Sequence, residues 1–276
     1  MDVESIIEKS YMTIKKNEGD YIGEDGLLYC GKCHTAKQVK INLLGTERTP
    51  MCLCKCESEK RETEKAEAEK KERLEQTKHY RLMGFPESNM QQWTFENADD
   101  KNPKLINVMK NYVDKFDIFR EQGKGLLLFG GVGCGKTYAA ACVANALIDQ
   151  GIPVLMTNFA RIANTVQGLF NGKQEYYDSL NRFPLLILDD LAAERKTEYM
   201  SEIVYNIIDA RYRAKLPLII TTNLTSDEIK NPNDIAYART FSRLLEMCFP
   251  FKAEGTDRRR EKCKKDFKSM SDLLDL

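Results

Sequence analysis

Apolar and polar residues alternate differently in the two parts of this chain. From about residue 84 onward, short apolar runs alternate with stretches of helical spacing. The runs are Leu126–Phe129, Val154–Thr157, Leu185–Asp189 and Leu218–Thr222. Such an alternation predicts βαβ units, and therefore an α/β fold with a parallel sheet flanked by helices. Another helix is predicted before the first strand, over Pro103–Phe119.

The first 83 residues follow another pattern. Residues 1–25 predict a short helix that runs into a Gly-containing loop, because four apolar residues recur at helical spacing: Ile6, Ile7, Tyr11 and Ile14. Residues 26–56 contain a group of cysteines and short extended stretches such as Gln38–Leu44. Residues 57–83 are mainly Glu, Lys, Arg and Ala, with oppositely charged pairs spaced to interact on a helix: Glu57–Arg61, Glu67–Lys71 and Glu69–Arg73. The predicted domains are therefore residues 1–56, a charged linker helix over 57–83, and residues 84–276.

Composition excludes several classes of protein. With 42 basic and 42 acidic side chains the net charge is zero, so any contact with nucleic acid requires a local basic patch. The longest apolar runs have the length of strands, and the N-terminus has no secretory signal, so we expect a cytoplasmic protein without a membrane partner. Five of the nine cysteines lie between residues 30 and 56, which indicates metal binding rather than disulfides.

The most specific motif is LLLFGGVGCGKTYAA, which begins at Leu126. Gly130, Gly135, Lys136 and Thr137 satisfy G-x-x-x-x-G-K-[ST] between a strand and a helical stretch. In such a loop the backbone N–H groups surround a polyphosphate, Lys136 reaches the β- and γ-phosphates, and the Thr137 hydroxyl coordinates Mg²⁺. The loop therefore predicts ATP binding, and its remaining positions are Gly131, Val132, Gly133 and Cys134.

Two later strands end in polar residues that complete such a site. In PLLILDDLAAE, Asp189 is placed to hold Mg²⁺ through water and Asp190 to polarise the attacking water. Glu194 is a second candidate for positioning that water. Alone, two acids at a strand end are more typical of a helix cap, but here they follow a complete phosphate loop. In LPLIITTNLT the strand ends at Thr221, Thr222 and Asn223, which can hydrogen-bond the same water.

The cysteines have the spacing of a small zinc site. Cys30 and Cys33 form a C-x₂-C turn, and Cys52, Cys54 and Cys56 follow about 20 residues later. A tetrahedral zinc site takes two thiolates from each group. The second group leaves the pair open, with Cys54 and Cys56 slightly favoured over Cys52. A segment of this size has little core, so zinc supplies folding free energy. Free or redox-active thiols are the alternative.

The three strands together resemble the core of an AAA+ ATPase, which assigns Asn223 the role called sensor 1. More of the chain is similar to the bacterial replicative helicase loaders of the DnaC/DnaI type, including those of phages and mobile elements. The matching pieces, in order, are CGKC and CLCKC, a charged helix, YRLMGFPE and WTFEN, GGVGCGKT, LILDDLAAE, TTN, FSRLLEM and GTDRR. The resemblance covers nearly the whole chain.

The resemblance implies further roles. Arg243 corresponds to an arginine finger that acts on a neighbouring subunit, and Arg259 to sensor 2, with the adjacent Arg258 as the alternative. Other arginines of this stretch (Arg239 and Arg260) are also available, and a basic or DNA-facing surface is the alternative. Phe170, with Lys173 nearby, corresponds to a contact with single-stranded DNA, the alternative being a core Phe on an amphipathic helix. A separate helical lid is expected to be absent or vestigial.

We therefore expect an ATP-hydrolysing helicase loader. Its zinc module contacts the hexameric replicative helicase, while its ATPase domains self-associate through their ATP sites and contact single-stranded DNA. An IstB-type transposase helper ATPase shares the phosphate-loop core and is the second hypothesis, which we expect to lack the cysteine module. A nucleotide-gated nucleic-acid-binding adaptor with negligible turnover is the third.

Overall fold

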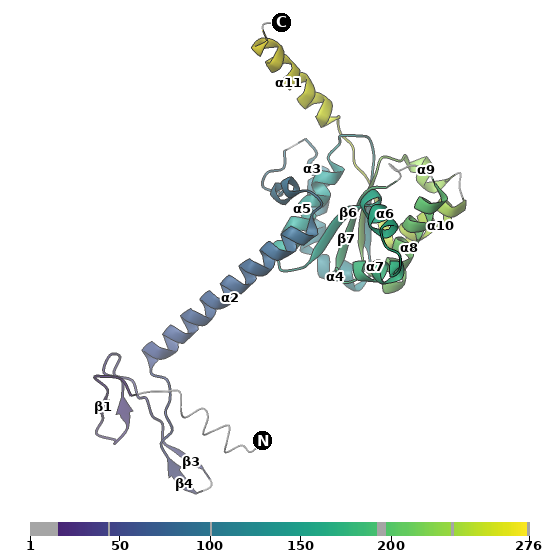
Figure 1. Ribbon diagram of the computed structural model, residues 1–276. Helices are drawn as coiled ribbons and strands as arrows, with labels where there is room; N and C mark the ends of the chain where they lie inside the picture. The colour runs from purple at the N-terminus through teal and green to yellow at the C-terminus, as the bar shows by residue number, and fades with distance from the viewer. Residues whose placement is uncertain (1–15, 44, 100, 192–196, 233–234, 275–276) are drawn as a thin grey trace. The chain divides into compact units, whose positions relative to one another are not determined.

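The computed structural model describes residues 16–43, 45–99, 101–191, 197–232 and 235–274 (Figure 1). The chain divides into two compact units, residues 1–74 and residues 75–276. The helix predicted within residues 1–25 falls largely outside the described residues, as does Glu194. Among the residues that are described, no helix combines the length and apolar character that a bilayer crossing requires.

The first unit consists of two short antiparallel hairpins and the beginning of a long helix. The strands are β1 (Tyr21–Ile22), β2 (Leu28–Tyr29), β3 (Ile41–Leu43) and β4 (Thr46–Arg48), with β1 paired to β2 and β3 paired to β4. Helix α2 (Lys55–Gly84) begins in this unit and continues into the second. The extended stretch predicted over Gln38–Leu44 thus contains β3, and the charged linker predicted over residues 57–83 lies within helix α2.

Helix α2 is a solvated helix over most of its length. Two of its ion pairs join residues four apart, Lys60 with Glu64 at 3.6 Å and Lys65 with Glu69 at 3.7 Å. These side chains are exposed, so the pairs add little to stability. Glu57 instead has a carboxylate oxygen 3.7 Å from Lys37 Nζ, which ties the first turn of α2 to the hairpins.

The second unit is built on a five-stranded parallel sheet in the order β6-β7-β8-β5-β9. The strands are β5 (Gly125–Phe129), β6 (Val154–Asn158), β7 (Leu185–Leu191), β8 (Leu218–Thr222) and β9 (Cys248–Lys252). Strand β8 lies between β7 and β5, so the polar end of β8 lies between the acidic pair and the phosphate loop. The predicted α/β fold with a helix-flanked parallel sheet is confirmed.

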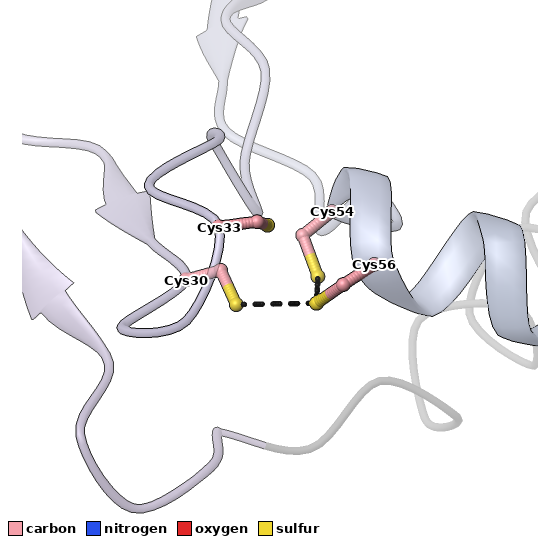
Figure 2. Close-up of side chains that lie close together, drawn as sticks. All are labelled: Cys30, Cys33, Cys54 and Cys56. Atoms are coloured by element: carbon pink, nitrogen blue, oxygen red, sulfur yellow. Dashed lines mark hydrogen bonds between the residues drawn. The ribbon is translucent and has the colours of Figure 1, made fainter.

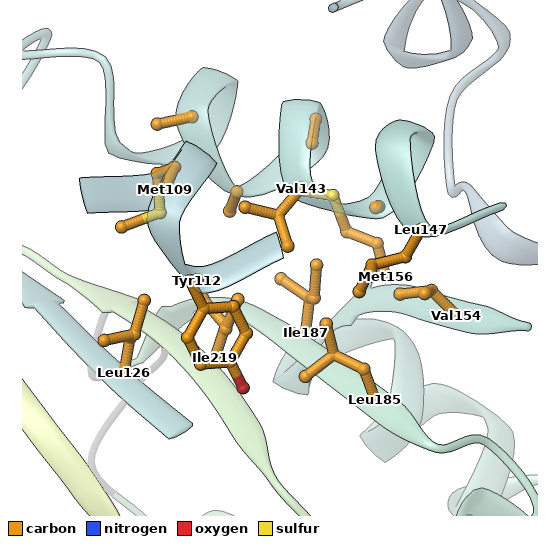
Figure 3. Packing of buried hydrophobic residues seen from close by; sticks show 14 of the residues in the cluster. Met109, Tyr112, Leu126, Val143, Leu147, Val154, Met156, Leu185, Ile187 and Ile219 are labelled. Carbon is orange, nitrogen blue, oxygen red and sulfur yellow. The ribbon is translucent and has the colours of Figure 1, made fainter. Parts of the chain in front are cut away.

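Successive side chains of the central strands point to opposite faces of the sheet, and both faces are buried. Leu126 and Leu128 belong to one apolar cluster, and Leu127 to the other. Ile187 and Ile219 join the first cluster, which Figure 3 shows beneath α5. Strands buried on both sides appear as continuous apolar runs, which is why the sequence predicts them well.

Helices cover both faces of this sheet (Figure 1). The first cluster is closed by the 3₁₀ turn η1 (Ser88–Gln92), α3 (Pro103–Asp114), α4 (Phe116–Glu121) and α5 (Lys136–Asp149). The second is closed by α6 (Phe159–Gln167), α7 (Lys173–Leu180), α8 (Glu198–Ala214), α9 (Ser226–Lys230) and α10 (Ile235–Met247). Helix α11 (Arg258–Leu273) follows β9.

Two sequence expectations need correction. The helix predicted over Pro103–Phe119 is two helices that break at Lys115, and the break lets Phe119 stack on Tyr112 with ring centroids 4.8 Å apart. Strand β9 was not predicted from the sequence. It is the edge strand beside β5, it contains Pro250 and it exposes Phe249, so it lacks the continuous apolar run of the inner strands.

Candidate nucleotide-binding site and cysteine cluster

The phosphate loop connects β5 to α5 at the carboxyl edge of the sheet. Gly133 and Gly135 have φ angles of 77° and 93°, in the left-handed region that favours glycine. A Cβ added at Gly133 would lie 2.1 Å from Asp257 Oδ1, and one at Gly135 would lie 3.1 Å from the Arg258 guanidinium carbon. The segment after β9 therefore packs directly on the loop and requires glycine at both positions.

Lys136 begins α5, and its side chain is buried against the loop. Its ammonium donates hydrogen bonds to the carbonyl oxygens of Gly130 at 2.9 Å and Gly131 at 2.8 Å, and to Asn223 Oδ1 at 2.9 Å. The Lys136 charge is thus fixed next to the end of β8. A cation held in this position can bind an anion that enters the loop.

Asp189 is at the centre of a hydrogen-bonded group that joins three neighbouring segments. Its Oδ1 accepts hydrogen bonds from Thr137 Oγ1 at 2.9 Å and from Thr221 Oγ1 at 2.6 Å. Burial raises the pKa of the Asp189 carboxyl above its ordinary value, although both hydroxyl donors act in the opposite direction. Thr137 and Asp189, the two predicted Mg²⁺ ligands, are therefore in direct contact.

Asp190 lies at an irregularity of β7. Its φ angle is 61°, and the register between β7 and β8 shifts between Leu188 and Leu191. The Asp190 amide donates to Thr221 Oγ1 at 2.9 Å, and Asn223 Nδ2 donates to Asp190 Oδ1 at 3.1 Å. A non-glycine residue in the left-handed region is uncommon and often marks a functional site. The shift turns the Asp190 carboxylate toward Asn223.

These side chains line a cavity of about 390 Å³, a size typical of small-molecule sites. It also contains Glu87, Met90, Trp93 and Tyr138, to which the sequence analysis gave no role. The rings of Trp93 and Tyr138 have centroids 5.6 Å apart. The sequence signals for this wall were the YRLMGFPE and WTFEN segments, which carried part of the family resemblance.

One buried amide holds that wall in place. Asn145 Nδ2, on α5, donates hydrogen bonds to the carbonyl oxygens of Met90 and Trp93, both at 2.9 Å. Tyr138 donates from its hydroxyl to the Thr94 carbonyl at 3.0 Å. Helix α5 thus carries the phosphate loop at its beginning and fixes the apolar wall farther along.

Both candidate sensor 2 arginines line the same cavity. Arg258 has its guanidinium against Gly135, and it pairs with Asp99 at 2.9 Å. Arg259 has an exposed side chain, and its backbone amide donates to Asp257 Oδ1 at 3.0 Å. The sequence favoured Arg259, whereas the structure brings both arginines to the cavity and places Arg258 directly on the loop.

Arg243 lies elsewhere, on α10, outside the lining of this cavity. Its guanidinium pairs with Asp209 Oδ1 at 2.6 Å and lies over the Tyr205 ring at 4.6 Å from the centroid.

Phe170 is fully exposed in the turn between α6 and α7, which rules out the alternative of a core phenylalanine. Lys173 is the first residue of α7, and its Nζ lies 5.8 Å from the centroid of the Tyr199 ring.

The cysteine cluster in the first unit gathers four of the five candidates. Figure 2 shows the side chains of Cys30, Cys33, Cys54 and Cys56 converging, and their sulfur atoms all lie within 4.8 Å of one another. Zn–S bonds of about 2.3 Å in a tetrahedron imply S···S separations of about 3.8 Å. The Cys30–Cys56 and Cys54–Cys56 separations are 3.7 and 3.4 Å. The donor set therefore fits zinc.

Cys52 is directed to another partner, since its thiol donates to the Ala36 carbonyl at 3.5 Å. The Thr35 hydroxyl, 3.0 Å from the sulfur, lowers the pKa of the Cys33 thiol to about 5, whereas burial raises the pKa of Cys54 to about 12. Of the three cysteines among which the sequence left the choice open, the structure brings Cys54 and Cys56 to the cluster with Cys30 and Cys33.

Comparison with known proteins identifies a family and several relatives. The model of the IstB-like ATP-binding proteins matches residues 59–265. The replicative helicase loader DnaI of Bacillus subtilis is 28% identical over 182 residues, covering 60% of this chain and 58% of that protein. DnaC of Escherichia coli is 25% identical over 146 residues, covering 50% and 58%. A protein of Sinorhizobium fredii named for an insertion sequence ATP-binding role is 37% identical over 131 residues, covering 46% and 43%. The matches thus span less than two thirds of each relative.

Solved structures resemble a large part of this chain. A crystal structure of DnaI has a TM-score of 0.54 at 23% identity and covers 65% of this chain and 98% of that chain. A crystal structure of the DnaC helicase loader has a TM-score of 0.54 at 24% identity and covers 61% and 100%. These similarities establish a common P-loop fold. Because the family model matches most of its length, the chain belongs to the family of IstB-like ATP-binding proteins, with helicase loaders of the DnaI and DnaC type among its relatives.

Proposed function

We propose that this protein is an ATP-dependent loader of a replicative DNA helicase. One observation carries the proposal. A phosphate loop with its acidic and polar partners and a separate four-cysteine module occur in one chain, and its relatives include proteins named replicative helicase loaders. In this proposal residues 1–56 bind the helicase and residues 84–276 bind and hydrolyse ATP. Residues 57–83 form the helix that links these two parts of the chain.

Nucleotide chemistry is assigned to the groups at the carboxyl edge of the sheet. Lys136 binds the β- and γ-phosphates, and Thr137 with Asp189 holds Mg²⁺. Asp190 polarises the attacking water and Asn223 positions it, which their mutual hydrogen bond supports. Glu194, outside the described residues, remains the second candidate for that water. Mg²⁺ supplies charge compensation for the phosphates and for the buried Asp189 carboxylate.

Zinc is assigned to the cysteine cluster. Cys30, Cys33, Cys54 and Cys56 offer four sulfur ligands, and a metal-bound thiol is deprotonated whatever its free pKa. Buried Lys37 supports the same arrangement, since its ammonium donates to Asp20 Oδ2 at 3.0 Å and approaches Glu57 on α2. We assign this module the contact with the hexameric helicase.

Self-association and DNA contacts complete the proposal. Arg243, remote from the nucleotide cavity of its own chain, acts on the ATP of a neighbouring subunit. Arg259, or its neighbour Arg258, contacts the phosphates in cis. Phe170 stacks on a base of single-stranded DNA, and its complete exposure supports this role, with Lys173 contributing positive charge.

A second candidate is an ATPase that assists a transposase. The family model and the 37% identity to the insertion-sequence protein favour it. A nucleotide-gated adaptor without appreciable turnover is the third possibility. Of these, only a loader requires the cysteine module to bind a replicative helicase.

Affinity capture of the host replicative helicase by the full chain, with and without ATP, tests the proposal. The parent protein should retain the helicase. The Cys30→Ser/Cys33→Ser double variant should not, although it should bind ATP as tightly as the parent. Cys52→Ser is the matched control and should capture normally. Equal capture by the double variant, or no capture by the parent, would refute the assignment of the module.

A further inference from the structure

A second cavity, of about 580 Å³, lies at the amino ends of β5 and β9, at the edge of the sheet opposite to the phosphate loop. It shares no lining residue with the nucleotide cavity. We call it the β9 groove. The apolar side chains that line it include Val108, Tyr112, Phe119, Leu126, Leu245 and Phe249. Leu245 is 39% exposed and Phe249 is 66% exposed, so part of this apolar lining faces solvent. Exposed apolar surface of this kind often marks an interaction site.

The charged groups that line the β9 groove are two lysines and one glutamate. The Glu246 carboxylate already accepts a hydrogen bond from the Tyr212 hydroxyl, which lies 2.9 and 3.0 Å from its two oxygens. Lys124 Nζ donates to the neutral carbonyl oxygen of Glu246 at 2.6 Å. Within the described part of the chain, neither Lys124 nor Lys115 pairs with a carboxylate. The groove therefore suits a partner that offers apolar side chains together with negative charge.

Helix α11 carries an apolar stripe. Cys263, Phe267, Met270 and Leu274 follow one another at intervals of four, three and four residues, so they lie on one side of the helix. Leu274 continues the helix, since its amide donates to the Met270 carbonyl at 3.0 Å. All four are exposed, Phe267 by 75% and Met270 by 57%. Amphipathic helices bind apolar grooves through residues at this spacing.

The charge along α11 changes sign toward its end. Arginine and lysine predominate from Arg258 to Lys268, whereas the following Ser269–Leu276 contain Asp272 and Asp275 and no basic residue. The apolar residues of the stripe continue into this acidic stretch. An end that is both apolar and acidic complements an apolar groove that contains two lysines.

The positions of the two surfaces favour contact between copies over contact within one chain. Helix α11 begins at Arg258, against Gly135 of the phosphate loop, whereas the β9 groove lies about 13 Å away, at the other end of β5. In the proposed self-association, Arg243 of one copy reaches the nucleotide cavity of the next copy, where α11 of that next copy begins. Leu245 and Glu246 follow Arg243 on α10 and line the groove, so the groove adjoins this contact. A helix of 16 residues is about 24 Å long and can extend into it.

We propose that the apolar stripe of α11 binds in the β9 groove of a second copy of this chain. This inference rests on the proposed self-association and adds to it a contact that involves no nucleotide. The two surfaces differ, so the contact is heterologous and can repeat from copy to copy. The apolar side chains provide the affinity, and the lysines select the acidic end of the helix.

The test uses the full-length, zinc-loaded protein with ATP and Mg²⁺, and follows self-association by sedimentation velocity. The helix variant is Phe267→Ser/Met270→Ser, and the groove variant is Leu245→Ser/Phe249→Ser. Each should raise the protein concentration needed for assembly by at least about tenfold, because two apolar anchors of the contact are lost. Both should keep the ATP affinity and melting temperature of the parent, since these side chains are exposed in the single copy. Ile118→Ser is the matched control, because Ile118 is 54% exposed but does not line the groove, and it should assemble like the parent.

Mixing the two variants tests the pairing of the two surfaces. The helix variant keeps its groove, and the groove variant keeps its α11. At a concentration where neither variant assembles alone, an equal mixture should therefore form dimers. A mixture without dimers would overturn the inference. Assembly of the groove variant alone, at the concentration at which the parent assembles, would show that α11 binds another surface and would overturn it as well.

Further outcomes separate this inference from the proposed function. If both variants assemble like the parent while Arg243→Ala does not, the contact at the ATP site stands and the α11 contact is wrong. If the parent itself does not assemble with ATP, both are wrong. If the groove variant assembles normally but no longer captures the replicative helicase, the groove binds the helicase, and the inference is overturned.

Discussion

In the unit of residues 75–276, five strands bury alternate side chains in two large apolar clusters, whereas the described residues of the first unit bury few apolar side chains. Those are Leu27, Leu28, Cys30 and Cys54, and two of the four are sulfur ligands of the candidate zinc site. Strands β1–β4 are two or three residues long, and such isolated hairpins are marginal in water. The second unit is therefore stabilised by its apolar core, whereas we expect the first to depend on a metal ion at its candidate zinc site.

The largest difference between the units should appear on removal of zinc. Chelation, or the Cys30→Ser/Cys33→Ser variant, should abolish protected structure in residues 16–54, because two thiolates cannot hold a tetrahedral ion. The second unit should keep its melting temperature. Amide hydrogen exchange measured for the two units separately checks this. If the amides of residues 16–54 stay protected in metal-free, reduced protein, the first unit does not depend on zinc, and the proposed difference between the two units is wrong.

Core truncation should show the opposite dependence. Ile187→Ala removes a fully buried side chain from the sheet and should cost about 2–5 kcal/mol of unfolding free energy in the second unit. Leu43→Ala in the first unit, where the side chain is 42% exposed, should cost less than about 0.5 kcal/mol. Denaturant unfolding, with zinc content measured in parallel, compares them. A larger cost for Leu43→Ala would contradict the comparison.

Nucleotide binding should depend on the second unit alone. Lys136→Ala removes the charge that faces the phosphates and should weaken ATP binding by at least about tenfold, while zinc content stays unchanged. Asp190→Asn should bind ATP but lose hydrolysis. Trp93 is the only tryptophan of the chain and lines the cavity, so its fluorescence reports binding. Phosphate release reports turnover. Parent-like ATP affinity in Lys136→Ala would show that the site is misassigned.

The smallest expected effect concerns Asp189. Burial raises its pKa in the folded protein, so at neutral pH folding has to bury a charge, and this cost disappears as the pH falls below the pKa of the unfolded chain. Asp189→Asn should therefore raise the melting temperature slightly at pH 7 without Mg²⁺, since the amide oxygen can still accept from Thr137 and Thr221. The variant should lose Mg²⁺-dependent turnover. A lower melting temperature of Asp189→Asn would contradict the inferred cost of burying the Asp189 carboxylate.

The sequence predicted those parts of the fold that depend on local pattern. The inner strands β5, β7 and β8 were predicted because both of their faces are buried, and the phosphate loop because glycine spacing defines it. Edge strand β9 was not predicted, since Phe249 is exposed and Pro250 interrupts the strand pattern. Pairing with β5 is a tertiary interaction that residue spacing does not encode.

The candidate site was predictable to a similar extent. Residues in motifs, such as Lys136 and Asp189, do meet in one cavity. The Trp93 wall depends on hydrogen bonds from Asn145, more than 50 residues later, which no motif indicates. Likewise, the position of Arg258 on Gly135 follows from how the chain returns after β9. Geometry of this kind requires the three-dimensional structure.

We propose that this protein loads a replicative helicase in an ATP-dependent manner. The most direct test of this proposal is the amount of helicase deposited on closed circular single-stranded DNA, measured with and without the full chain and ATP. Deposition of the helicase should require both the protein and ATP. It should be lost with Lys136→Ala and with Cys30→Ser/Cys33→Ser but kept with Cys52→Ser. Deposition that is unchanged without the protein, or that the protein suppresses in the presence of ATP, would contradict it.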